Sequence, residues 1–254
     1  MQKKISISVL STVLVSLVMS LRLAQGIQLD EHTVALYLFD EKKGKEVMDS
    51  SLNENHGKIV GKVEWSEGKF DGALSFSGGN AFVEIPSSDS LDITDALTIE
   101  MWLYLRNYST AGGTGVTKET SYKLGPRNDK KIVFRITSEN QAWAQAFIAS
   151  KTDIPLKEWH HIAGTYDTKS GEMKVYLDGE EDGDGKLKGK IVPNASVVWL
   201  GRGASPFLDG LLDEVRISNV VREKAEIKKS MLGFTFSVPL FNTLSATWGR
   251  IKSR

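Results

Sequence analysis

The sequence predicts an all-β protein built from two packed antiparallel sheets. From Thr33 onward, short runs of apolar or alternating residues are separated by clusters of Gly, Asn, Asp and Ser, at the intervals that sandwiches show. No long segment with a helical period interrupts these runs before Arg222. The 254 residues suffice for one all-β domain with a large core.

Residues 97–105 show the alternation most clearly. Their odd positions are apolar throughout, and their even positions hold Thr98, Glu100, Trp102 and Tyr104. Because neighbouring side chains of a strand point to opposite faces, we expect the apolar positions in the core. Comparable runs predict further strands at 33–39, 73–76, 82–85, 131–137, 141–149, 159–166, 172–177, 197–200 and 208–218.

Two local signals complete this framework. Asp178 and Gly179 follow the run 172–177 and predict a tight hairpin, since both residue types tolerate positive φ. Residues 222–232 predict one short C-terminal helix that ends at Gly233. Its apolar side chains, which we expect to cover the end of a sheet, are Ala225, Ile227, Met231 and Leu232.

The first 26 residues predict export. Lys3 and Lys4 precede an apolar stretch at 5–21 and a small-x-small ending at 24–26, which is typical of a secretory signal peptide. A membrane anchor is the alternative, but the stretch is short for a bilayer span. We therefore divide the chain into a signal peptide at 1–26, a domain at 27–232 and a tail of unknown role at 233–254. We expect no membrane span after signal cleavage, and a secreted, periplasmic or cell-surface location.

Composition narrows the possible partners. Lys plus Arg and Asp plus Glu both number 32, so the chain lacks the excess positive charge that non-specific nucleic-acid binding requires. The chain contains no Cys, which excludes disulfides and thiolate chemistry even in an exported protein. Stability must come from the packed core, or from the core and a bound ion.

Six segments in a fixed order resemble the laminin-G-like domains of exported bacterial proteins. They begin with ALYLFDEKKGKEVMDSSLNENHG, GKFDGALSFSGGNAFVEIP and LTIEMWLYL, and continue with EWHHIAGTYD, MKVYLDGE and FLDGLLDEVRISN. The resemblance spans about 35–232 and implies a concanavalin-A-like, two-sheet antiparallel jelly-roll sandwich whose first and last strands are adjacent. It also implies frequent bound calcium and a role in carbohydrate or protein recognition. The ligand stays open, because one fold hosts many functions.

The segment 49–55 is the first candidate metal site. Side-chain oxygens recur there at every second position, in Asp49, Ser51, Asn53 and Asn55. A loop that wraps a hard cation such as Ca²⁺ needs several oxygens at short range. The pattern is not an EF-hand loop, because Glu54 replaces its glycine. A turn in which these side chains bond to the backbone is the alternative, and the pattern favours it.

Asp213 completes the candidate metal set. It shares strand parity with Leu211 and Val215, so we expect it to point into the core. A buried carboxylate needs a partner. The candidates are a histidine of the strand 159–166, a set of backbone amides, or calcium. A structural Asp that ties the last strand to its neighbours is the favoured interpretation.

Aromatic side chains on the predicted sheet surfaces are candidates for ligand binding. Trp102 and Tyr104 share the outer face of 97–105, and one face of 141–149 holds Gln141, Trp143, Gln145 and Phe147. An aromatic ring beside amides suits a pyranose, which has an apolar C–H face and a rim of hydroxyls. Arg135 and Asn80 join the set as polar groups near these positions. Packing in the core or at an edge is the alternative for each ring.

No predicted strand carries the acids of a glycosidase. Hydrolysis by the usual route needs two carboxylates across a cleft, yet Glu100 stands alone and Asp213 and Glu214 face opposite ways. G-x-S-x-G, H-E-x-x-H and phosphate-loop patterns are absent. The sequence therefore favours an exported, non-catalytic recognition module for a glycan or an extracellular protein, with calcium as its candidate cofactor. The alternatives are a glycoside hydrolase or polysaccharide lyase of the concanavalin-A-like class, and a structural or adhesive part of the cell envelope.

Overall fold

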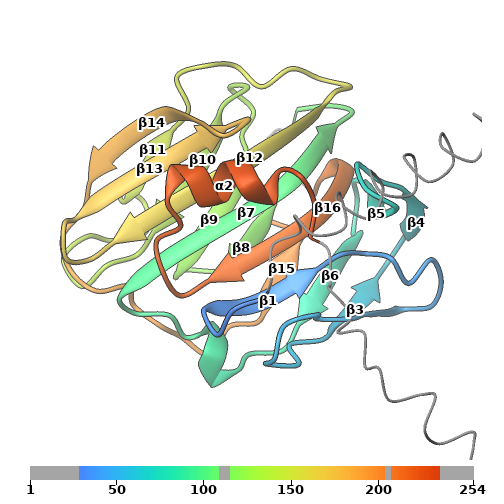
Figure 1. The fold of residues 1–254 in the computed structure, drawn as a ribbon, viewed down its shortest axis with the longest axis horizontal. Helices are drawn as coiled ribbons and strands as arrows, with labels where there is room; N and C mark the ends of the chain where they lie inside the picture. Colours follow the sequence, from blue (N-terminus) through green and yellow to red (C-terminus); the bar gives the residue numbers. More distant parts are fainter. Residues whose placement is uncertain (1–28, 109–114, 204–206, 235–254) are drawn as a thin grey trace, which may run out of the picture. The chain divides into compact units, whose positions relative to one another are not determined.

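The strands form two antiparallel sheets that pack face to face (Figure 1). The computed structural model describes residues 29–108, 115–203 and 207–234. Sheet A has the order β14-β13-β12-β7-β16-β5-β4, with β1 also paired to β16; sheet B has the order β11-β10-β9-β8-β15-β6-β3-β2. Residues 29–233 pack as one unit. The expected signal peptide, and all of the expected tail except Gly233 and Phe234, lie outside the described residues.

The element bounds are as follows. Sheet A contains β1 (Thr33–Tyr37), β4 (Val63–Glu67), β5 (Gly72–Ser77), β7 (Ala96–Leu105), β12 (Trp159–Asp167), β13 (Glu172–Leu177), β14 (Glu180–Lys186) and β16 (Asp209–Ser218). Sheet B contains β2 (Glu46–Val47), β3 (Gly57–Val60), β6 (Phe82–Ile85), β8 (Val116–Lys118), β9 (Tyr122–Pro126), β10 (Ile132–Ile136), β11 (Phe147–Ala149) and β15 (Val198–Leu200). Two short helices, η1 (Asp89–Leu91) and α2 (Lys224–Ser230), complete the described secondary structure.

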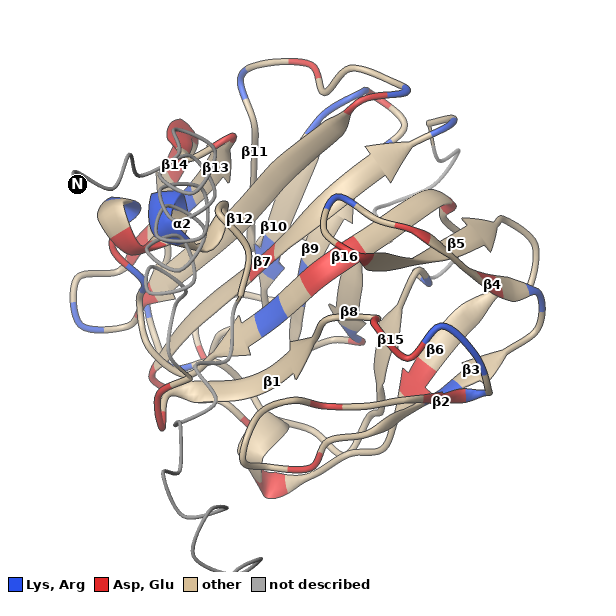
Figure 2. Ribbon diagram, turned by 45° about the vertical axis from the view of Figure 1, so that its right-hand side comes forward, with Lys and Arg blue, Asp and Glu red and all other residues tan. Residues whose placement is uncertain are grey.

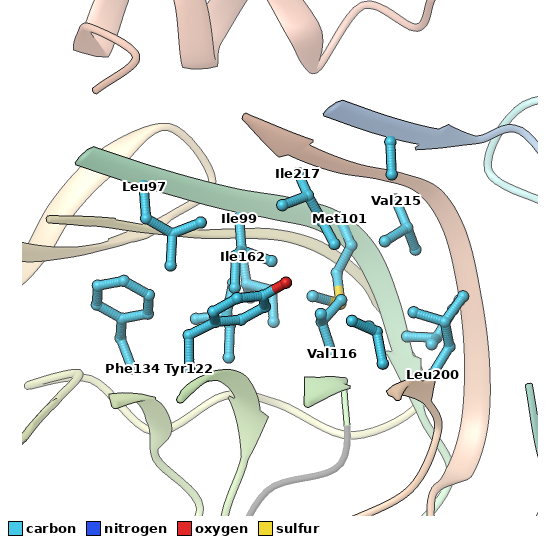
Figure 3. Close-up of a cluster of buried hydrophobic side chains, with 14 of the residues drawn as sticks. Leu97, Ile99, Met101, Val116, Tyr122, Phe134, Ile162, Leu200, Val215 and Ile217 are labelled. Atoms are coloured by element: carbon cyan, nitrogen blue, oxygen red, sulfur yellow. The ribbon is translucent and has the colours of Figure 1, made fainter. Parts of the chain in front are cut away.

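The hydrophobic core lies between the two sheets, and the inward-facing side chains of β7 belong to it. The apolar odd positions of β7 are all buried, as predicted. Figure 3 shows side chains of β7, β12 and β16 pointing toward those of β8, β9, β10 and β15. The hairpin between β13 and β14 is also confirmed, since Asp178 and Gly179 turn with φ of 50° and 75°. The adjacency of the first and last strands is confirmed by the pairing of β1 with β16.

One predicted strand is mostly wrong. Of the segment 141–149, only β11 is a strand, and 142–146 forms a turn in which Gln145 and Ala146 donate backbone hydrogen bonds to the carbonyl of Ala142. The alternating alanines explain the error, because alanine has little preference for a strand and offers little surface for a neighbouring sheet. Gln141 and Gln145 therefore do not share a strand face with Trp143.

The predicted orientation of Asp213 is wrong as well, because β16 contains a bulge. The register of β16 with β7 shifts between Asp213 and Arg216, and Glu214 lies in the left-handed region with φ of 51°. A bulge reverses which side the following residues face. Asp213 therefore lies opposite Trp102, on the outer side of sheet A, while Val215 beyond the bulge points into the core.

The helix α2 lies over the face of sheet A and not over its end (Figure 1). Ile227 packs there against Ala163 of β12 and Tyr176 of β13. Met231 is half-buried, whereas Ala225 and Leu232 are exposed, so two of the four apolar residues expected at this contact do not take part in it. Glu223 caps the helix, and its side chain and that of Glu226 bond reciprocally to backbone N–H groups.

A buried ionic network joins α2 to the centre of sheet A. The Glu100 carboxylate of β7 pairs with Arg216 of β16, accepts a hydrogen bond from the Ser230 hydroxyl of α2 and lies 3.4 Å from His161 Nε2 of β12. Figure 2 shows the acidic and basic positions along the middle of β16. Burial by itself raises the pKa of Glu100, but Arg216, His161 and Ser230 overcome that effect and hold the pKa at about 2.

A second ion pair joins the segment before β1 to the segment between β16 and α2. Arg222, which precedes α2, donates hydrogen bonds to both carboxylate oxygens of Asp30 at 2.5 and 2.6 Å. Asn219 also donates a backbone hydrogen bond to the carbonyl of His32. The bidentate guanidinium holds the pKa of Asp30 well below its usual range.

We predict that Glu100→Gln lowers the free energy of unfolding by about 3–5 kcal/mol at pH 7, because Arg216 stays buried without this carboxylate. Urea denaturation measures the change. The exposed acid Glu172 on β13 supplies the control, and Glu172→Gln should change stability by less than about 0.5 kcal/mol. The folded-state pKa lies below the unfolded value, so the contribution of Glu100 is present above about pH 4.5 and is lost toward pH 2. Equal losses in the two variants would contradict a stabilising role for the network.

Candidate functional site

The outer face of sheet B carries one continuous row of aligned residues. The strand registers place one residue of each of the eight strands in line. From β11 to β2 the row runs Phe147, Arg135, Lys123, Thr117, Trp199, Glu84, Lys58 and Glu46. Side chains at aligned positions share a face, so these aromatic and charged residues form one surface.

An arginine–aromatic cluster lies at the β11 end of this row. The guanidinium carbon of Arg135 lies 5.2 Å from the ring centre of Trp143 and 4.9 Å from that of Phe147. Arg135 Nη1 also donates a 3.0 Å hydrogen bond to the carbonyl of Trp143. Arg127 approaches the other partner, with its guanidinium carbon 5.4 Å from the ring of Phe147. The half-buried Trp143 is therefore fixed on its turn by Arg135.

A second cluster of the same kind lies near β15. The guanidinium carbon of Arg202 lies 4.0 Å from the ring centre of Trp199 and 4.6 Å from that of Phe82. Phe207 stacks on Phe82 with ring centres 6.0 Å apart, and Trp199 Nε1 lies 3.4 Å from a carboxylate oxygen of Glu84. Cation–π contacts of this kind hold a guanidinium plane in a fixed orientation.

Two buried polar side chains occupy the surface between the clusters. Lys123 of β9 is 8% exposed, and burial together with the charge of Arg135 lowers its pKa to about 8. The hydroxyl of Thr117 on β8 is buried and has no hydrogen-bond partner among the described residues. Buried polar groups with shifted pKa values are typical of binding sites.

The structure gathers four of the seven predicted ligand residues. Trp143 and Arg135 are in contact, and Gln141 and Gln145 lie on the same turn, where the Gln141 amide donates to the carbonyl of Gln145 at 3.0 Å. Asn80 is exposed on the turn between β5 and β6. The turn thus joins the two glutamines to each other, and Arg135 contacts Trp143.

Trp102 and Tyr104 lie on sheet A and do not form the predicted open platform. Trp102 is 5% exposed, because Phe70 and His161 pack edge-on against it and the Lys69 amine lies 4.3 Å from its ring centre. Tyr104 packs against Trp159 and is half-buried. The turn before β5 thus covers the ring that the alternation pattern left open to solvent.

The loop that contains Asp49 closes on itself. The Asp49 carboxylate accepts hydrogen bonds from the backbone N–H groups of Leu36, Ser51 and Asn55 at 2.8, 2.8 and 2.9 Å. The Ser51 hydroxyl donates a fourth bond at 2.7 Å, and the amide of Asn53 donates to the carbonyl of Thr33. A bound calcium ion would have to be coordinated by the same carboxylate oxygens that accept these hydrogen bonds. The arrangement therefore fits a turn closed by side-chain hydrogen bonds better than a calcium site.

The predicted metal ligand Asp213 is fully buried beside backbone amides. One carboxylate oxygen accepts the N–H of Phe70 at 2.9 Å, and the other has no partner among the described residues. Burial raises the pKa of Asp213 to about 7, although the Phe70 N–H opposes the shift. No group of three or more His, Cys, Asp or Glu in the part of the chain that the structure describes could hold a metal ion.

Sequence reasoning missed the cluster near β15. Its members, Trp199, Arg202, Phe82 and Phe207, come together because β15 lies between β8 and β6, an order that the sequence does not reveal. The alternation of the valine, tryptophan and leucine in β15 was the available signal, since it places Trp199 opposite the two buried aliphatic residues.

Comparison with known proteins gives the family and the fold. The family model described as "Concanavalin A-like lectin/glucanases superfamily" matches residues 77–228. No curated protein sequence shows a significant match to this chain. Among the described residues, no helix has the length and apolar character to cross a bilayer.

Three solved structures illustrate the likeness. The binding domain of Paraclostridial Mosquitocidal Protein 1 has a TM-score of 0.63 and 15% identity, over 79% of this chain and 52% of that one. The binding domain of botulinum neurotoxin DC, solved with rat synaptotagmin II, has a TM-score of 0.63 and 14% identity, over 82% and 53%. Domain 4 of AbnA, a GH43 extracellular arabinanase from Geobacillus stearothermophilus solved with arabinotriose, has a TM-score of 0.57 and 21% identity, over 77% and 96%. This chain spans about half of each toxin domain and nearly all of the arabinanase domain.

We predict that Asp213→Asn abolishes part of the pH dependence of stability. The raised pKa means that the folded protein holds this proton more tightly than the unfolded chain. The stability due to protonated Asp213 is therefore complete below about pH 4 and is lost as the pH rises through 7. The variant should gain about 2–4 kcal/mol relative to the wild type between pH 4 and pH 8.

Urea denaturation across this range measures the effect. The exposed neighbour Asp71 provides the control, and Asp71→Asn should keep the wild-type profile. An Asp213→Asn profile parallel to that of the wild type would show that the carboxylate is ionised in the folded state throughout.

Proposed function

Because the chain belongs to the concanavalin A-like lectin/glucanase superfamily, we propose that it is an exported, non-catalytic module that binds carbohydrate on the outer face of sheet B. The row of aromatic and cationic side chains across that face carries the proposal. The predicted signal peptide supports export.

The two faces of the sandwich differ in what they offer a ligand. The outer side of sheet A is partly covered, by α2 and by the turn that packs on Trp102. The outer face of sheet B keeps Trp143, Trp199 and Phe147 partly exposed, with Phe147 at 37%. Aromatic rings held by hydrogen bonds and cation–π contacts supply apolar contact area at little entropic cost.

A catalytic role has less support. In the outer-face row, Glu84 is separated from the next acid, Glu46, by Lys58, and Glu46 is exposed at the sheet edge. A hydrolase needs an acid and a second carboxylate across one cleft. A protein ligand remains the second candidate, since arginine and tryptophan also dominate protein interfaces.

We predict that Trp143→Ala weakens glycan binding at least tenfold, or about 1.4 kcal/mol, without lowering the melting temperature by more than a few degrees. A glycan array identifies the ligand, and titration calorimetry measures the loss. Trp65 on β4 of sheet A is the matched control, so Trp65→Ala should leave the affinity unchanged. A collapse of stability in Trp143→Ala would instead assign this ring to packing, and release of reducing sugar from the bound glycan would show an enzyme.

We also predict that calcium leaves the melting temperature unchanged. The hydrogen bonds to Asp49 already occupy both of its oxygens. An ion that binds the folded state raises apparent stability in proportion to the logarithm of its concentration. Melting in millimolar calcium and in chelator tests this expectation. A rise with calcium that Asp49→Asn removes would assign the ion to this loop.

A further inference from the structure

We propose that the carbohydrate bound on the outer face of sheet B is acidic, and that Arg135 binds one of its carboxylate groups. This inference rests on the proposed function and names the class of ligand. It follows from three features of the cluster at the β11 end of the row: the bonding of Arg135, the charges around it and the position of its guanidinium on the rings.

Arg135 is a half-buried cation that no carboxylate of the described residues contacts. Its guanidinium donates a hydrogen bond to the carbonyl of Trp143 and lies against the rings of Trp143 and Phe147. A partly desolvated guanidinium in a protein normally pairs with a carboxylate or phosphate. The unused N–H groups of Arg135 are therefore the donors that an incoming anion would meet.

The neighbouring positive charges make a bound anion more favourable at Arg135. Burial and the nearby Arg127 lower the pKa of Arg135, and burial and Arg135 lower that of Lys123. Asp129 pairs with Arg127, and the charge of Glu119 acts on Lys123, so neither acid is a direct partner of Arg135. Cations placed close together destabilise the free protein, and a bound anion relieves that repulsion.

The position of the guanidinium also selects the kind of contact. Because Arg135 lies over the rings of Trp143 and Phe147, a sugar that contacts these rings also meets the guanidinium. The stacked guanidinium presents its planar fork of donors, which matches the two oxygens of a carboxylate. A uronic or sialic acid carries such a group, and an arabinan or glucan does not.

The second cluster extends the surface for such a ligand. Arg202 is held on Trp199 and Phe82 in the same manner and contacts no carboxylate among the described residues. Three strand steps separate β10 from β15 in sheet B, which is a span of roughly 14 Å. An acidic oligosaccharide of several units that crosses β9 and β8 would meet both arginines.

Matched pairs of glycans test the proposal. Calorimetry on the full chain would compare trigalacturonate with its methyl ester, trimannuronate with its methyl ester, and sialyllactose with lactose. We expect at least one acidic member to bind tenfold or more tightly than its neutral partner, with an affinity that falls as salt rises. Arg135→Gln should remove the preference for the acidic member. Arg135→Lys should keep only part of that preference, because a lysine cannot bind a carboxylate through two parallel hydrogen bonds. Lys186→Gln, which removes one exposed charge from β14 of sheet A, should have no effect.

The outcomes separate this proposal from the proposed function. Binding of neutral and acidic members with equal affinity would overturn the acidic preference and leave carbohydrate binding intact. If the chain binds neither these glycans nor any member of a broad array, the proposed carbohydrate binding and the acidic preference are both overturned. If poly-L-glutamate binds as tightly as the best acidic glycan, the site recognises carboxylates without selecting a sugar, which also overturns the proposal.

Discussion

The buried Glu100 carboxylate is the contact on which the arrangement of sheet A depends. It lies on β7, between β12 and β16, and it interacts with a residue of each neighbour and with Ser230 of α2. A carboxylate so deeply buried is favourable only while its partners stay in place. The network therefore fixes the helix on the sheet. The helix thereby covers part of the outer side of sheet A.

Period-two alternation predicted the core of this protein well, because a two-sheet core imposes the same rule on every strand. It failed on β16, where one bulge reversed the side that Asp213 faces. It also failed for Trp102, whose position on the outer face was right but whose exposure was not. Alternation reports the side on which a residue lies, and a turn far away in sequence decides whether that side is covered.

The candidate site shows a different limit. Trp143 and Arg135 could be selected from the sequence as an aromatic and a polar residue near plausible sheet positions, although Trp143 lies on a turn instead of a strand. Trp199 and Arg202 could not be connected to them, because the pairing of β15 with β8 and β6 is a long-range property of the jelly roll. A row across eight strands exists only once their order is known.

The ion pair between Asp30 and Arg222 couples the first strand of the sandwich to the last. Because β1 and β16 are neighbours and the ion pair joins the residues just outside them, both strands are held together at one place in sheet A. Neither strand can fray there without breaking the same bidentate contact, so the two strands should open as one cooperative unit.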